Sequence, residues 1–164
     1  TKSEGGERAI EPEAYFDLNE ALGALGVPML DLELALCLSH EARAQKAIDA
    51  LHAGGAVLVL SSHDFEKTPP RAVLVERYAQ MAALGGDLPK IAVMPQSQRD
   101  VMVLLSAMTE ASAEHAPLVG ISMGELGKIT RVRGGAFGSA MTFASKGKAS
   151  APGQIDAETL ASML

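Results

Sequence analysis

Five short apolar runs rich in branched residues recur along the chain, and this pattern predicts the strands of a sheet. Most of them are almost continuously apolar, which is typical of parallel strands that are covered on both faces. The five runs cover residues 27–34, 56–64, 90–95, 118–123 and 139–145. Their spacing leaves room for a helix between consecutive strands, as in repeated strand–helix–strand units.

Segments with a helical spacing of apolar residues precede, follow and separate most of these runs. They are predicted to form helices at 8–25, at 38–53, between Pro70 and Gly85, at 98–114 and at 156–164. The sequence therefore predicts a single α/β domain over residues 1–164, with about five parallel βα units. A closed (β/α)8 barrel needs about 250 residues. We therefore expect either an open sheet or an incomplete TIM barrel that lacks its first strands.

Composition and charge exclude several classes of protein. The net charge of −6 disfavours nucleic acid or an anionic membrane as the main partner. No apolar run has the roughly 18–20 residues that a membrane-spanning helix needs. The polar start, TKSEGGERA, lacks the apolar region of a signal peptide, and the single Cys37 lies among leucines. We expect a cytoplasmic protein with a buried, inert thiol, and, because Thr1 is not preceded by methionine, part of a longer chain.

Ionisable residues share one face with apolar residues on three of the predicted strands. Side chains alternate between the two faces of a strand. Asp31 and Glu33 therefore share one face of the first predicted strand, and Ser61 and His63 share one face of the second. Lys90 shares its face with alanine. Burying such charges costs several kcal/mol each unless they are paired. A paired network of this kind is common at active sites.

Lys90 and His63 are the residues best suited to chemistry. Ala92 follows Lys90 on the same face and leaves room for the long side chain. An amine buried among apolar groups loses its proton more readily and can attack a ketone. His63 ends its strand, where it could act as a general acid and base. The alternatives are a lysine that reaches solvent and a histidine that caps the strand, and Asp64 is expected to cap the following turn.

Two loops that follow the last strands could bind an anion. Residues 124–135 carry Lys128, Arg131 and Arg133, and residues 148–154 offer small and amide side chains. The alternative for the basic loop is a solvated surface. No cluster of histidine, cysteine and acidic residues has metal-ligand spacing, so we predict no metal site. The other three histidines are expected to be structural or exposed.

Six motifs, in this order, closely resemble those of type I 3-dehydroquinate dehydratase across essentially the whole chain. They are SEGGER, SSHDFEKTP, LPKIAVMPQ, SMGELGKITR, FGSAMTFAS and KASAPGQ. The resemblance implies a (β/α)8 barrel of the shikimate pathway that dehydrates 3-dehydroquinate to 3-dehydroshikimate through an imine on a lysine. It implies no cofactor and no metal, and a possible homodimer. It also implies about three N-terminal strands that this sequence does not contain, so we expect the chain alone to have little activity.

The resemblance also assigns roles to single residues. The Schiff-base lysine falls on Lys90, and the general acid and base on His63. The carboxylate that orients the histidine falls on Glu4 of SEGGER. The arginine that binds the substrate carboxylate falls on Arg131, with Thr130 before it where many relatives have serine. The substrate-holding pair of ASAPGQ consists of Ser150 and Gln154.

Two other functions stay open from the sequence. The first is another imine-forming, class I aldolase-like barrel, which would share the lysine without needing the histidine–glutamate pair. The second is a catalytically inactive fragment or an assembly module of a multifunctional shikimate-pathway protein.

Overall fold

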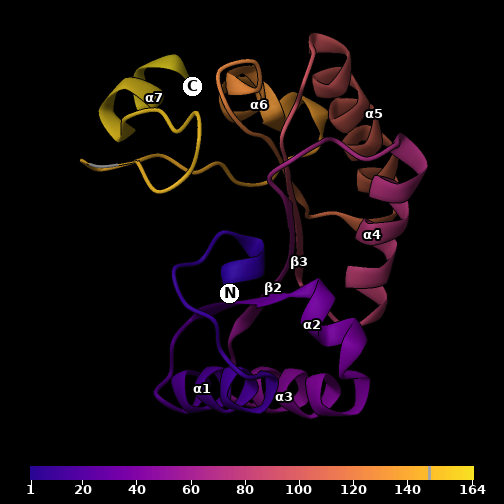
Figure 1. Cartoon of the computed structure of the whole chain (residues 1–164), viewed down its shortest axis with the longest axis vertical. Helices are drawn as coiled ribbons and strands as arrows, with labels where there is room; N and C mark the ends of the chain where they lie inside the picture. The colour runs from indigo at the N-terminus through magenta and orange to yellow at the C-terminus, as the bar shows by residue number, and fades with distance from the viewer. Residues whose placement is uncertain (148) are drawn as a thin grey trace.

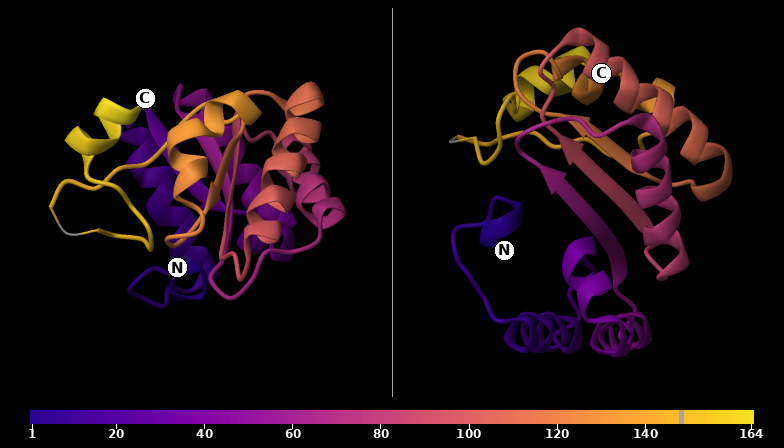
Figure 2. Two further views of the ribbon diagram at one scale, coloured as in Figure 1. Left: turned by 90° about the horizontal axis from the view of Figure 1, so that it is seen from above. Right: turned by 45° about the vertical axis from the view of Figure 1, so that its right-hand side comes forward.

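The computed structural model of the chain, which describes residues 1–147 and 149–164, has one parallel sheet (Figure 1). The sheet order is β1-β2-β3-β4, so that neighbours in sequence are neighbours in the sheet. The strands are β1 (Met29–Glu33), β2 (Val57–Asp64), β3 (Leu88–Val93) and β4 (Val119–Ser122). The strands curve with the helices on their outer side, like part of a barrel wall (Figure 2). The predicted incomplete TIM barrel is confirmed in this respect.

Helices cover the convex side of the sheet and connect the strands. The longer helices are α1 (Pro12–Ala24), α3 (Glu41–Ala53), α4 (Arg71–Ala83) and α5 (Gln98–His115). The shorter ones are α2 (Leu34–Ser39), α6 (Lys128–Arg133) and α7 (Ala157–Met163), with single 3₁₀ turns η1 (Lys2–Glu4) and η2 (Gly134–Phe137). Helix α5 begins at a capping box in which Ser97 and Asp100 each bond the backbone of the other.

The predicted fifth strand at 139–145 is wrong. This segment forms only two isolated parallel bridges, Leu118 with Ser139 and Ser145 with Asp156, and the amide of Ala140 donates to the Leu118 carbonyl at 2.7 Å. The Ser139 hydroxyl accepts from the amide of Gly120 and donates to the carbonyl of Met141. A side chain therefore takes the place of ladder hydrogen bonds. In the described residues the segment has β4 on one side and no strand on the other, so the sheet has four strands.

Two predicted elements have different boundaries from those expected. The helix expected at 38–53 is two helices, because the backbone of His40 leaves the helical region (φ −137°, ψ 50°) between α2 and α3. The predicted basic loop at 124–135 contains α6. Within it the Thr130 hydroxyl donates to the Gly127 carbonyl at 2.8 Å and accepts from the Ser122 amide at 3.0 Å. These bonds join the helix start to the end of β4.

The two faces of the strands bury different sets of side chains, as the alternation predicts. The convex face carries the main core between sheet and helices, with Leu58 and Leu60 of β2 fully buried. The concave face carries a smaller apolar group, with Val59, Leu88, Ala92, Val119 and Ile121 as members. The ionisable residues predicted to share a face therefore project from the concave side of the sheet.

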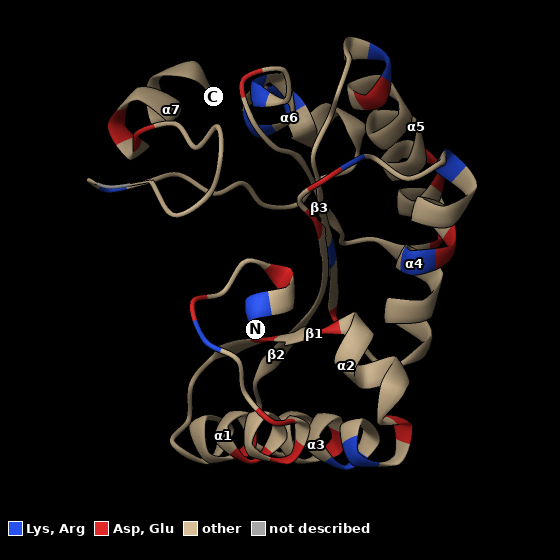
Figure 3. Cartoon of the chain, in the orientation of Figure 1, with Lys and Arg blue, Asp and Glu red and all other residues tan. Residues whose placement is uncertain are grey.

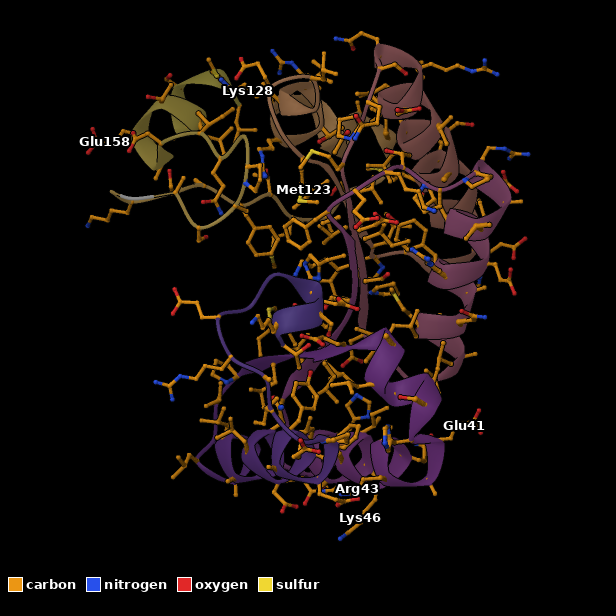
Figure 4. The ribbon with its side chains drawn as sticks, in the orientation of Figure 1. Glu41, Arg43, Lys46, Met123, Lys128 and Glu158 are labelled. Atoms are coloured by element: carbon orange, nitrogen blue, oxygen red, sulfur yellow. The ribbon has the colours of Figure 1, made fainter. Side chains whose placement is uncertain are left out.

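Arg43 of α3 holds α1 against α3. Its guanidinium bonds Glu13 at 3.0 Å, Asp17 at 2.7 Å and Glu20 at 2.5 Å, all on α1. The guanidinium also lies 5.2 Å from the centre of the Phe16 ring. Figure 3 shows the charged residues of the two helices side by side, and Figure 4 labels Arg43 among them. This contact fixes α1, and with it the path of the preceding segment toward β2.

Cys37 is fully buried in α2, and its thiol is expected to be inert. Burial raises the pKa of Cys37 to about 11, with the nearby carboxylate of Glu33 adding to the effect. At pH 8 only roughly one thiol in a thousand would then be ionised, and the thiolate is the reactive form. We predict that a thiol reagent at pH 8 modifies the folded chain at least about 100-fold more slowly than the urea-unfolded chain. Equal rates in the two states would show that Cys37 is accessible.

Candidate active site

One cavity of about 440 Å³ lies on the concave side of the sheet. It is bounded by the strands, by the N-terminal segment around η1 and by the loop that leads to α7, and Figure 2 shows both segments on this side. All six residues predicted for the site line it, and they are Glu4, His63, Lys90, Arg131, Ser150 and Gln154. The structure thus brings together residues that are up to 150 positions apart in the sequence.

Lys90 of β3 projects into this cavity and forms an ion pair there. Its Nζ lies 2.8 Å from Oδ2 of Asp31, and its side chain is 12% exposed. The ring of Phe143 lies on its apolar side, 5.3 Å from Nζ to the ring centre. Lys90 therefore lies among apolar neighbours and beside one carboxylate, that of Asp31. The alternative that the lysine reaches bulk solvent is not supported.

His63 is held by Glu4 through two hydrogen bonds. Oε2 of Glu4 accepts from the backbone amide of His63 at 3.0 Å and lies 2.9 Å from its Nδ1. The carboxylate partner assigns the ring proton to Nδ1, so Nε2 is the atom that can take up or release a proton. Gly5, with φ of +88°, allows this approach, because a Cβ there would lie 2.3 Å from the Phe65 ring.

Asp64 has the separate role that the strand alternation predicts. Its Oδ1 accepts from the backbone amides of Glu66 at 3.0 Å and Lys67 at 2.9 Å. Asp64 therefore caps the turn after β2 and is not the partner of His63.

Arg131 of α6 is a buried cation at the edge of the cavity. Only 2% of the residue is exposed, and its two terminal nitrogens donate to the carbonyls of Phe143 and Pro152, each at 3.2 Å. Its Nε is buried without a partner, and no acidic residue of the described part of the chain pairs with it. Burial lowers the pKa of Arg131, yet a guanidinium remains charged in proteins. The site therefore suits a ligand with an anionic group.

Ser150 and Gln154 lie in the loop before α7 and bond each other. Oε1 of Gln154 accepts from the Ser150 amide at 2.8 Å and lies 3.2 Å from its hydroxyl. These two polar side chains and Arg131 reach the cavity from the same side, since Arg131 bonds the carbonyl of Pro152 in that loop. Lys148, part of the same predicted loop, lies outside the described residues.

The other basic residues of the predicted anion-binding loop lie away from the cavity. Lys128 pairs with Glu125 at 2.9 Å on the surface, and Figure 4 labels it between α6 and α7. Neither Lys128 nor Arg133 lines the cavity. For these two residues the solvated-surface interpretation fits the structure.

Tyr15, Phe143 and Met123 are among the lining residues that were not predicted from the sequence. Tyr15 of α1 accepts a hydrogen bond from the Glu33 amide at 2.9 Å, and burial raises the pKa of its hydroxyl above the ordinary value. Phe143 lies in the segment wrongly assigned to a strand, and Met123 follows β4 and points toward the concave side in Figure 4. Only Met123 had a usable signal, because it ends an apolar run at the same edge as His63.

Residues 1–147 and 149–164 contain no group of three or more histidine, cysteine or acidic side chains placed to hold a metal ion. No helix in the same residues combines the length and apolarity that crossing a bilayer requires.

Comparison with known proteins gives consistent matches along the whole chain. The chain is 48% identical to a 3-dehydroquinate dehydratase of Klebsiella pneumoniae over 158 residues, which are 94% of this chain and 62% of that protein. It is 46% identical to one from Listeria monocytogenes, covering 98% of this chain and 64% of that protein. The chain therefore spans less than two thirds of the length of these relatives.

Solved protein structures also match the fold of this chain. A type I 3-dehydroquinate dehydratase from Clostridium difficile, described as carrying covalently modified comenic acid, superposes with a TM-score of 0.93 at 39% identity, over 99% of this chain and 64% of that one. The 3-dehydroquinate dehydratase of Geobacillus kaustophilus gives a TM-score of 0.93 at 37% identity, over 100% of this chain and 63% of that one. The family model described as Type I 3-dehydroquinase matches residues 1–164, and the chain belongs to this family.

Proposed function

We propose that this chain is the part of a 3-dehydroquinate dehydratase of the shikimate pathway that contains the imine-forming lysine. The observation that supports it most is the meeting of three groups in one cavity: the Lys90 amine, the His63–Glu4 pair and the buried Arg131. An amine, a proton carrier and an anion-binding cation are the groups that dehydration of a keto acid through an imine requires.

The reaction begins at Lys90. The Lys90 ammonium first loses one proton, and the neutral amine attacks the ketone carbon. The ketone oxygen then leaves as water with that proton and one proton of the amine, which gives an iminium. The iminium draws electrons and makes the proton on the adjacent carbon easier to remove. Nε2 of His63 takes this proton, the electrons form a carbon–carbon double bond, and the β-hydroxyl leaves with a proton from the same imidazole. Water then hydrolyses the iminium and frees the lysine.

Glu4 and Arg131 support these steps without exchanging protons with the substrate. Glu4 keeps the proton on Nδ1, so that Nε2 faces the reaction in the basic form, as the carboxylate does in a catalytic triad. Arg131 binds the substrate carboxylate through its planar guanidinium, and Ser150 and Gln154 bond substrate hydroxyls. We further propose that the protein works in the cytoplasm as one domain and as a homodimer.

Turnover is proposed to need more than the 164 residues. More than a third of the length of each relative has no counterpart in this chain. The described residues leave one side of the cavity open. We define the completed chain as this sequence joined to the part of the Klebsiella pneumoniae relative that lies outside the match.

A direct assay tests this proposal. The completed chain is incubated with 3-dehydroquinate, or in parallel with a ketose phosphate, and formation of the conjugated enone product is followed by absorbance. Dehydration of 3-dehydroquinate without cleavage of the ketose phosphate supports the proposal. Cleavage of the ketose phosphate would instead favour the aldolase-like function, and the absence of both reactions would favour an inactive assembly module.

A further inference from the structure

We infer that Asp31 is the counter-ion of Lys90 throughout the reaction and that Ser61 fixes its carboxylate in place. The catalytic part of this inference rests on the proposed imine chemistry, whereas the pairing itself does not. Neither Asp31 nor Ser61 is among the residues that the sequence motifs assign to the site.

Three adjacent strands place these residues together. In the parallel register Ser61 of β2 lies directly opposite Lys90 of β3. Asp31 of β1 lies opposite Val59, which is the residue before Ser61 on the same face of β2. The Asp31 carboxylate therefore spans β2. Its Oδ1 accepts from the Ser61 hydroxyl at 2.5 Å, and its Oδ2 lies 2.8 Å from Nζ of Lys90. Ser61 is only 1% exposed, so this donor is fixed by packing.

The other charged groups around the cavity already have partners. Glu33 of β1 accepts from the hydroxyl of Thr1 at 2.7 Å. Glu4 of η1 holds His63, and Tyr15 of α1 bonds the Glu33 amide. Arg131 of α6 is cationic and repels an ammonium. Asp31 is therefore the carboxylate among the described residues that is available to Lys90.

The charge balance of imine formation shows what this pair does. An ammonium and a ketone give an iminium and one water, so that one positive charge is present at the lysine nitrogen before and after the step. Asp31 faces this nitrogen in both states and loses no proton overall. The carboxylate therefore stabilises the iminium as well as the ammonium.

Labelling of individual lysines tests the pairing without any substrate. The chain is reductively methylated with formaldehyde and cyanoborohydride across a pH range, and each lysine is quantified by mass spectrometry of its peptide. Asp31→Asn removes the charge with little change in shape. At pH 7 we expect Lys90 to react about 10-fold faster in this variant, because only the neutral amine reacts and the ammonium has lost its partner.

A matched variant and a reciprocal one make the result decisive. Glu125→Gln breaks the exposed pair with Lys128 and is expected to leave the labelling of Lys90 unchanged, as surface ion pairs contribute little. Lys90→Met tests the pair from the other side, because the carbon NMR signal of the Asp31 carboxylate at pH 7 should then shift with the loss of the neighbouring ammonium. If Asp31→Asn unfolds the chain, this comparison decides.

The inference is overturned if Lys90 labels at the same rate in the parent and Asp31→Asn chains, or if the NMR signal of the Asp31 carboxylate is the same with and without Lys90. Failure of the proposed function gives a different pattern, in which the pairing is seen but the completed chain neither forms an adduct nor dehydrates 3-dehydroquinate.

Discussion

Replacing His63 with alanine in the completed chain is expected to reduce turnover of 3-dehydroquinate by about 10²–10⁴-fold, the range typical for loss of a general acid and base. The imidazole removes the proton next to the iminium and then protonates the departing hydroxyl, and no other described group in the cavity combines these capacities near neutral pH. Imine formation needs only the amine, so the covalent adduct should still form. Product absorbance measures the first effect and mass spectrometry the second.

A second histidine provides the matched control for this prediction. His52 of α3 also pairs with a carboxylate, Asp87, at 3.1 Å, but it does not line the cavity. His52→Ala should therefore leave turnover close to that of the parent. Near-normal turnover in His63→Ala would mean that this residue only caps its strand, and that another group carries the proton.

Replacing Lys90 has the largest expected effect, because the covalent intermediate is then impossible. Lys90→Met keeps most of the side-chain volume beside Phe143 and Ala92 but has no amine, so we expect loss of both the adduct and measurable turnover. Lys90→Arg keeps a positive charge for Asp31 to pair with, yet a guanidinium stays protonated and cannot form an imine. Turnover assays of both variants separate the need for charge from the need for an amine.

The control for the lysine variants is Lys128→Met in α6. Lys128 pairs only with the exposed Glu125 in the described residues, and its loss should change neither adduct nor turnover. Retained turnover in Lys90→Arg would show that Lys90 acts only as a cation.

The strand pattern predicted the part of the site that lies on the strands, because period-2 alternation can be followed along each strand by itself. It placed His63 and Lys90 on one face, and the parallel register then brings them and Asp31 to the concave side. The pattern could not show that Asp31 contacts Lys90, since this depends on how far β1 is shifted against β2. Parallel order of the four strands followed from their apolar character and spacing.

The rest of the site depends on segments whose position no periodicity encodes. Glu4 was assigned only through the resemblance, which also selected Arg131 and Gln154 from the two predicted anion-binding loops, and the structure brings all three to the same cavity. The segment 139–145 misled the prediction, because its alternating small and apolar residues resemble a strand. In the structure only isolated bridges at Ser139 and Ser145 join it to its neighbours, and Phe143 between them covers Lys90 instead of joining a ladder.

Trapping the covalent intermediate tests the central claim most directly. The completed chain is mixed with 3-dehydroquinate, reduced with borohydride and digested, and the modified peptide is identified by mass spectrometry. We expect the adduct on Lys90, with its amount falling to background in Lys90→Met and persisting in His63→Ala. An adduct on Lys67 or Lys128, or turnover of 3-dehydroquinate without any trapped adduct, would contradict an imine at Lys90.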